Sequence, residues 1–312
     1  MLDIDSFRPP CSLILSERNT KELVLVEYDL TSGQSIEIMK EIQKRADGTW
    51  MTSPSLSPSG RWIEYAVWSG DFYYNSAEFQ NVEISQIPNG KPIQITSAGG
   101  AMNTGGVWSP VKDQVAFTDL DQKGYQQLYI YNPEEVEKKE RITNFSDPDI
   151  RIRTIIWSEQ GDKLALVIDR ENQEKSEDEL WLVGLQPLNV NKIDLQENFS
   201  IISSQLYWSD DGRMIVIFTN DNSGQFGIYW ININEMNVQY NIRGDQLGQF
   251  KLLENPFPLT RNLFVFGSLS QNLLVDISKD IFFKFQEDIF LLDWRIMDGL
   301  IINEDIKLCN QK

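Results

Sequence analysis

Two adjacent carboxylates, Asp210 and Asp211, stand beside a serine and a glycine in YWSDDGRMIVIFTND, residues 207–221. Paired carboxylates can divide acid and base roles between them or bind a divalent cation. A related segment of the chain carries Glu159 and Gln160 at the same two places. Because a shared chemistry would need the same side chains in each copy, this pattern favours a turn over a catalytic or metal site.

A second pair, Asp119 and Asp121, begins the DxDxxG pattern of a calcium-binding loop. Lys123 stands where the next ligand belongs, and Ile130 replaces the bidentate glutamate that closes such a loop. Aspartate at the end of a strand commonly accepts hydrogen bonds from the backbone of the following turn. We therefore expect both carboxylates to shape a turn, and we predict no metal ion for this chain.

The composition excludes several classes of site and partner. The chain has no histidine, which removes Ser-His-Asp and Cys-His catalysis and histidine-ligated zinc. Its 46 acidic and 28 basic residues give a net charge of -18, which repels phosphate backbones and anionic lipid headgroups. No apolar run reaches the roughly 18 residues that a membrane-spanning helix needs. We predict no cofactor, no nucleic acid and no membrane insertion.

The N-terminus and the two cysteines bear on the compartment. Residues 1–19 lack the basic region, uninterrupted apolar stretch and cleavage site of a signal peptide, so we expect a cytoplasmic protein. A mature or trimmed chain would have the same start and would belong in the periplasm or outside the cell. Cys11 and Cys309 form neither a CxxC motif nor a disulfide framework, and whether they pair stays open.

The segment around Asp210 is one of four related copies, which begin near Ser55, Val107, Ile156 and Tyr207. The copies recur about every 50 residues, a period typical of propeller blades. Each copy has a serine that opens a turn, three copies have a tryptophan before the serine, and three have a glycine after it. The recurring residues are Ser57, Ser109, Ser158 and Ser209; Trp108, Trp157 and Trp208; and Gly60, Gly161 and Gly212.

Within each copy the sequence alternates between strands and turns. After the serine turn comes an apolar run such as KLALVI or MIVIFT, followed by a second strand and a shorter segment, so each period supplies about four strands. The runs are apolar at successive positions, as expected when both faces of a sheet are buried. We expect Trp208 to lie between neighbouring blades, and Gly60, Gly161 and Gly212 to supply the positive φ of the turn.

These patterns predict an all-β fold, a single β-propeller domain over residues 1–312. We expect six blades of four antiparallel strands, with seven blades as the alternative. The repeats are clear over residues 54–242, and residues 11–45 and 250–305 form divergent blades. Strands from the N- and C-terminal ends are expected to pair and close the ring, because closure removes an exposed sheet edge.

The motifs VWSPVKDQVAFTD and YWSDDGRMIVIFTND, each followed by an LY or IY strand, resemble the WD-like repeats of TolB-type β-propellers. The resemblance covers residues 54–242 well and the flanks weakly. It implies a scaffold that binds other proteins, or a propeller that gates substrate in a peptidase. The chain departs from the periplasmic members of that family in lacking a signal peptide and the extra N-terminal domain, so the resemblance implies no TolB-specific partner or compartment.

Two groups of residues are candidates for binding. The segment VWSGDFYYNSAEFQN inserts a long loop with five aromatic residues, which are typical anchors of protein interfaces. The alternative is that some of them cover their own blade as a local core. These residues are Trp68, Phe72, Tyr73, Tyr74 and Phe79. Arg151 and Arg153 belong to a segment expected to line the central channel, where they would make one mouth positive.

The chain has no GxSxG elbow and no phosphate-binding glycine loop. We therefore interpret it as a non-catalytic protein-binding or scaffold propeller within a larger complex. The expected partner is a protein with a basic or apolar patch. One alternative is a propeller hydrolase of the lactonase or esterase type with a channel-bound calcium, although the expected channel segments hold almost no carboxylates. The other is a sensor or gating domain of a larger protein.

Overall fold

The structure of the protein, a computed structural model, describes most of residues 50–243 together with the strands within residues 3–42 and 257–285. Between residues 50 and 243 the description leaves out 70–77, 88–89, 98–104, 136–138, 171–177, 196–199, 210–211 and 221–225. Side chains are described for most of residues 54–238. Packing and hydrogen bonding can therefore be followed from the second sheet to the fifth.

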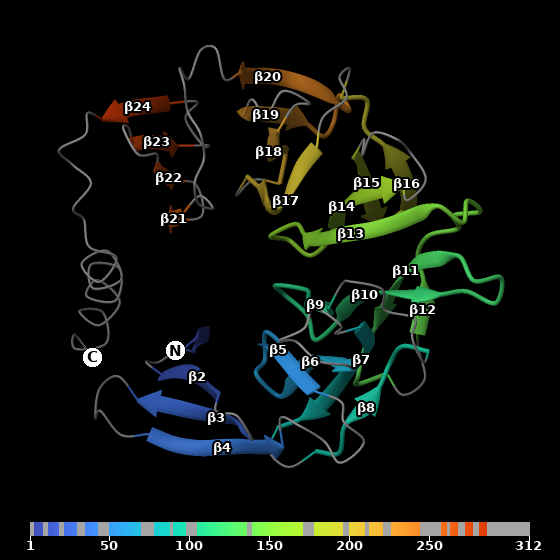
Figure 1. Ribbon diagram of the computed structural model, residues 1–312, viewed down its shortest axis with the longest axis vertical. Coiled ribbons are helices and arrows are strands. Elements are labelled where there is room, and N and C mark those ends of the chain that lie inside the picture. The colour runs from blue at the N-terminus through green and yellow to red at the C-terminus, as the bar shows by residue number, and fades with distance from the viewer. Residues whose placement is uncertain are drawn as a thin grey trace. The chain divides into compact units, whose positions relative to one another are not determined.

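Every described strand belongs to one of six antiparallel sheets of four strands each (Figure 1). The first three blades are β1 (Asp3–Arg8), β2 (Ser12–Arg18), β3 (Glu22–Asp29) and β4 (Ser35–Ile42); β5 (Trp50–Leu56), β6 (Trp62–Ser69), β7 (Glu78–Gln86) and β8 (Ile93–Gln94); and β9 (Val107–Trp108), β10 (Val115–Leu120), β11 (Gln126–Tyr131) and β12 (Lys139–Arg141). The last three blades are β13 (Ile150–Trp157), β14 (Lys163–Arg170), β15 (Glu179–Leu185) and β16 (Leu188–Lys192); β17 (Ser200–Trp208), β18 (Met214–Asn220), β19 (Phe226–Asn232) and β20 (Asn237–Arg243); and β21 (Phe257–Thr260), β22 (Leu263–Gly267), β23 (Asn272–Asp276) and β24 (Ile281–Phe285). In the described part of the chain, no helix has the length and apolar character to cross a bilayer.

The blades fall into two compact units, of which one contains the first three blades and the other, Asp149–Asp298, the last three. First strands of successive blades contact one another at three joints within these units. β5 contacts β1 and β9, and β13 contacts β17. Four-stranded meanders that meet through their first strands are the blades of a propeller. The predicted all-β propeller fold is confirmed, with six blades among the described residues.

The first blade draws all four of its described strands from residues 3–42. Residues 286–312, at the C-terminal end of the chain, lie outside the described residues, as do Cys11 and Cys309. Closure of the ring by the two chain ends therefore stays a prediction, and so does the single domain over residues 1–312.

The middle strands of the blades are buried on both faces. In β10 the side chains of residues 115–119 are all buried, and in β14 those of residues 164–168. The fourth strands β12 and β16 are exposed at nearly every position. Because successive residues of a strand point to opposite faces, an unbroken buried run means that both faces of the strand are covered. This explains why the strands are apolar at successive positions.

The serine turn has the same hydrogen bonds in three of the copies. The N–H of Ser57, Ser158 or Ser209 donates to the carbonyl five residues later at 2.9, 2.9 or 3.0 Å, and the glycine N–H donates back to the serine carbonyl. The three glycines, Gly60, Gly161 and Gly212, have φ of 62°, 65° and 64°, which L-residues rarely adopt. The predicted turn is confirmed, although the Asp210–Asp211 pair within it lies outside the described residues.

The repeat tryptophans Trp108, Trp157 and Trp208 are buried. Trp108 packs with side chains of β6 and β7 from the blade before it, and Trp208 with side chains of β14 and β15. The indole N–H of Trp108 donates to the carbonyl of Ser55 at 3.1 Å, and that of Trp208 to the carbonyl of Ile156 at 3.4 Å. Ser55 and Ile156 both stand two residues before their repeat serine. The expected place of Trp208 between blades is confirmed, and the structure adds a hydrogen bond that recurs in two joints.

Replacing these tryptophans by phenylalanine tests the hydrogen bond. Trp108→Phe and Trp208→Phe each replace an indole by a smaller phenyl ring and remove the indole N–H. The loss of packing should therefore be similar in the two variants. Because the Trp108 bond is the shorter, at 3.1 Å against 3.4 Å, we expect Trp108→Phe to lower the free energy of unfolding by about 0.5–1 kcal/mol more. Urea denaturation followed by circular dichroism measures both. Equal losses would mean that ring packing alone holds the joint.

Candidate binding site between two blades

A pocket with a cavity volume of about 490 Å³ lies where turns of the second blade (β5–β8) and the third blade (β9–β12) meet. Its walls come from the β5–β6, β9–β10 and β11–β12 turns. These turns lie at the same end of their sheets, because antiparallel strands reverse direction at each connection. The lining residues are Pro58, Ser59, Arg61, Val111, Lys112, Asp113, Gln114, Asn132 and Glu134. The pocket therefore spans one joint between two blades.

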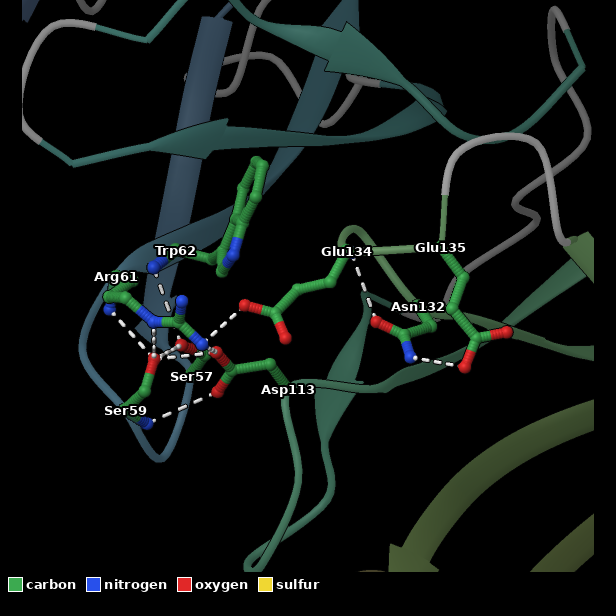
Figure 2. A network of polar contacts seen from close by, with 8 residues as sticks. All are labelled: Ser57, Ser59, Arg61, Trp62, Asp113, Asn132, Glu134 and Glu135. Atoms are coloured by element: carbon green, nitrogen blue, oxygen red, sulfur yellow. Dashed lines mark hydrogen bonds and ion pairs between the residues drawn. The ribbon is translucent and has the colours of Figure 1, made fainter.

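Arg61 is the centre of the polar network in this pocket (Figure 2). Its Nη2 lies 3.2 Å from Oδ2 of Asp113 and forms a second ion pair with Glu134. Its Nε donates to the hydroxyl of Ser59 at 3.2 Å. Arg61 belongs to the second blade and both carboxylates belong to the third, so the network ties the two blades together at this end.

Asp113 is the fixed carboxylate of the network, and Glu134 is the exposed one. The Asp113 side chain is 7% exposed, whereas that of Glu134 is 46% exposed. Oδ1 of Asp113 accepts the backbone N–H of Ser59 at 3.1 Å, and Oδ2 accepts the Ser59 hydroxyl at 2.5 Å. Water screens the ion pair between the exposed Arg61 and Glu134 side chains, so that pair contributes little stability. Asp113 therefore holds the turn, and Glu134 is accessible to a ligand.

Asn132 positions Glu134 at the start of the β11–β12 turn. Its Oδ1 accepts the N–H of Glu134 at 3.0 Å, and its Nδ2 donates to Oε1 of Glu135 at 3.1 Å. An asparagine side chain commonly replaces a backbone acceptor in this way. Figure 2 shows Glu134 directed toward Arg61, while Glu135 bends back to Asn132.

Charged side chains of both signs line the pocket, from Arg61, Lys112, Asp113 and Glu134. Val111 is 51% exposed beside the two carboxylates and offers an apolar contact. The hydroxyl of Ser57 accepts the N–H of Trp62 at 3.3 Å, and that of Ser59 donates to Asp113. A serine nucleophile needs an adjacent base, most often histidine, and the chain has no histidine. The exposed Glu134 and Val111 are the lining side chains that a bound molecule could contact without disturbing the turn held by Asp113.

The predicted aromatic loop is described only at its two ends. Trp68 lies in β6 and Phe79 in β7, and the two residues pair in the register of these strands. The loop is therefore shorter than the sequence analysis expected, because the two strands extend further. Trp68 is half-buried and packs on the cluster between the second and third blades, as a core residue does. Phe72, Tyr73 and Tyr74 lie outside the described residues, and their part in binding stays a prediction.

Arg151 and Arg153, the residues assigned to a channel mouth, both lie in β13. Nη2 of Arg153 lies 2.6 Å from Oδ2 of Asp178 and donates to the carbonyl of Ile201 at 2.7 Å. The buried Asp178 also accepts the N–H of Ile201 at 2.5 Å. Arg153 thus ties the fourth blade (β13–β16) to the fifth (β17–β20), and Asp178 balances its charge. Arg151 donates to the carbonyl of Ile150 at 2.8 Å.

Asp121 shapes the β10–β11 turn, as the sequence predicted. Its Oδ1 accepts the N–H groups of Lys123 and Tyr125 at 2.8 and 3.0 Å. Desolvation acts to raise the pKa of this carboxyl, but the two N–H donors and the charge of Arg141 outweigh it, so the pKa lies below its usual value. The side chain is thus occupied by the turn that it forms.

Asp119 makes a longer-range contact than the sequence predicted. Its buried carboxylate accepts the backbone N–H of Leu120 at 2.9 Å and that of Ser97, which follows the second blade, at 3.0 Å. Lys139 of β12 forms an ion pair with the same carboxylate and lies 4.5 Å from the centre of the Tyr129 ring. Asp119 therefore joins two blades as well as shaping a turn.

Glu64 of β6 is a buried carboxyl that the sequence analysis did not single out. It is 2% exposed, and it accepts the Ser55 hydroxyl at 2.9 Å and the N–H of Gly106 at 2.8 Å. Burial raises the pKa of Glu64 to about 8, against the opposite effect of these two hydrogen bonds. Alignment of the copies would have found it, because the other copies have apolar residues at this place. These residues are Ala116, Ala165 and Val216.

No family model and no curated protein sequence matches the chain. Solved structures do match. Dipeptidyl peptidase 4 from Porphyromonas gingivalis covers 92% of this chain at 13% identity, with a TM-score of 0.59. An oligogalacturonate lyase in complex with manganese covers 89% of this chain and matches over 74% of its own, at 11% identity and a TM-score of 0.56. TolB from Acinetobacter baumannii covers 88% of this chain and matches over 63% of its own, at 16% identity and a TM-score of 0.45.

The chain spans about half the length of the peptidase that it matches, 46% of that chain. Likeness at these identities shows the fold, and the fold is that of propeller proteins. TolB, whose family the repeats resemble, is among the matches. Because the matched proteins include both a peptidase and a lyase, the fold by itself assigns no activity.

The two carboxylates that meet Arg61 provide a matched test of the network. Asp113→Asn removes a buried charge that accepts two hydrogen bonds from Ser59, so we expect the free energy of unfolding to fall by about 1–3 kcal/mol. Glu134→Gln removes the exposed charge, and we expect a loss below about 0.5 kcal/mol. Urea denaturation at neutral pH measures both variants. Similar losses would mean that the network is equally exposed at both carboxylates.

Proposed function

We propose that the chain is a non-catalytic propeller that binds another protein, as a scaffold subunit of a larger complex. The observation that carries this proposal is the pocket between the second and third blades, where Asp113, Glu134 and the exposed Val111 line one cavity. Turns held on a rigid scaffold are the usual place for recognition. The net charge of -18 favours a partner with a basic patch, because opposite charge speeds encounter and fixes orientation.

The geometry supports a division of roles within the pocket. A lysine or arginine of the partner would compete with Arg61 for Glu134, whose ion pair is exposed and costs little to break. Asp113 would keep the shape of the turn when the partner binds, because its two carboxylate oxygens accept the N–H and the hydroxyl of Ser59. An apolar side chain of the partner would cover Val111. The proposed partner segment therefore has a basic residue next to an apolar one.

Site-specific crosslinking in the native host tests this proposal. A photoreactive amino acid replaces Val111 in one variant and Leu188 in the control, because these side chains are equally exposed, at 51% and 52%, and Leu188 lies on β16 of the other unit. We expect one specific protein to be crosslinked from position 111 and none from position 188. Adding Glu134→Lys should lower the yield from position 111 at least about tenfold, through like-charge repulsion.

The crosslinking outcomes separate the proposal from its alternatives. Equal crosslinking from both positions, or a yield that Glu134→Lys leaves unchanged, would refute the pocket as the binding site. Calcium binding in a calorimetric titration, together with ester or lactone hydrolysis, would instead support the propeller hydrolase that the sequence left as an alternative.

A second candidate is a sensor or gating domain of a larger protein. The observation that favours it is the match to the peptidase, which covers 92% of this chain but 46% of the peptidase. The mass of the native protein, isolated with an antibody against this propeller, decides between the two. A mass near the 36.1 kDa of this chain supports the separate scaffold subunit, and a larger single polypeptide supports the domain.

A further inference from the structure

One pair of residues distinguishes the joint between the second and third blades from the equivalent joint between the fourth and fifth. In the latter joint, Ala165 and Leu206 belong to one buried hydrophobic cluster. In the joint between the second and third blades, Glu64 takes the place of Ala165, seven residues after a repeat serine. Gly106 takes the place of Leu206, three residues before the next repeat serine. A small and a large apolar residue are thus replaced by a carboxylic acid and a glycine.

The glycine is what leaves room for the carboxylic acid. A Cβ atom at Gly106 would lie 2.8 Å from Cγ of Glu64 and 2.7 Å from Cγ2 of Val115, closer than real Cβ atoms approach. The backbone N–H of Gly106 instead donates to Oε1 of Glu64 at 2.8 Å. Glu64 and Gly106 therefore form a hydrogen-bonded pair that joins β6 to the segment before β9.

Among the described residues, the surroundings of the Glu64 carboxyl supply hydrogen bonds but no positive charge. Ser55 of β5 donates to Oε2 of Glu64 at 2.9 Å, and Ile84 of β7 and Val115 of β10 are the apolar neighbours. Glu83 lies next to Ile84 on β7 and so points to the opposite face of the sheet. Among the described residues, no charged side chain contributes to the pKa of Glu64, and burial is the main cause of its rise to about 8.

We propose that Glu64 makes the joint between the second and third blades proton-linked, so that the joint is closed with the carboxyl protonated and opens when the proton is lost. A neutral carboxyl can stay buried between Ser55 and Gly106, since the serine hydroxyl can donate to it or accept from it. An ionised carboxylate without a cation is costly to bury. Arg61 and Asp113 span the same two blades, so opening separates the walls of the pocket.

The direction of the pH effect follows from the raised pKa. Between the ordinary value of 4.5 and about 8, the closed joint keeps the proton and the opened joint releases it. Opening therefore becomes more favourable as pH rises through this range, by up to about tenfold for each pH unit, and the effect ends above pH 8. This linkage belongs to the joint itself and holds whatever partner the pocket binds.

Hydrogen exchange on the whole chain at pH 6 and pH 8, corrected for the intrinsic rate of exchange, tests the proposal. We expect the opening equilibrium of β9 and β10 to rise by up to about 50-fold between these pH values. In Glu64→Gln, which keeps the shape of the side chain but cannot ionise, the rise should be less than about threefold. The internal control is the joint around Ala165 and Leu206, which should change by less than threefold in both proteins.

The outcomes decide the proposal without reference to any partner. A rise in β9 and β10 that Glu64→Gln leaves intact, or an equal rise in the control joint, would overturn it. If Glu64→Gln does not fold, Glu64→Leu, which is apolar and leaves Gly106 unchanged, should remove the pH dependence. Should both variants fail to fold, the comparison of the two joints in the unaltered protein decides: unequal rises support the proposal and equal rises refute it.

Discussion

The packing of each blade against the next is the interaction on which the rest of this structure depends. A four-stranded sheet with two apolar faces cannot bury both faces by itself, so each blade needs a neighbour on either side. The unbroken buried runs of β10 and β14 show that both faces of these strands are covered. Trp108 and Trp208 then fix the approach of neighbouring blades, because each fills the joint and binds a carbonyl of the previous first strand.

Polar contacts add specificity to these apolar joints. Asp119 joins the second and third blades through Ser97, and Arg153 with Asp178 joins the fourth and fifth through Ile201. Each buried carboxylate has a cation or backbone N–H groups beside it, as burial of charge requires. Glu64 accepts one backbone N–H, from Gly106, and one serine hydroxyl, and among the described residues no charged side chain contributes to its pKa. That difference is the basis of the proton linkage proposed for the joint between the second and third blades.

The joint between the second and third blades also contains the candidate binding pocket. The pocket and the Glu64–Gly106 pair both depend on residues that differ from those of the other copies. The second copy lacks the glycine of its turn, and its Asp113 reaches back to Ser59 and Arg61 of the copy before it. A repeat sets the common scaffold, so residues that break its pattern without loss of packing are the ones to examine for function. Since propellers serve both enzymes and binding proteins, function has to be argued from such sites rather than from the fold.

The sequence by itself determined the elements: the serine turns with Gly60, Gly161 and Gly212 at positive φ, the doubly buried strands and the all-β propeller. These elements depend on local backbone chemistry and on a pattern that recurs within the chain, so they can be recognised from this single sequence. The sites depend on contacts between residues roughly 40 to 55 positions apart, such as Glu64 with Gly106, Ser59 with Asp113 and Arg153 with Ile201. Only the tertiary structure could decide these, because the orientation of a side chain across a joint is set by the neighbouring blade and not by its own strand.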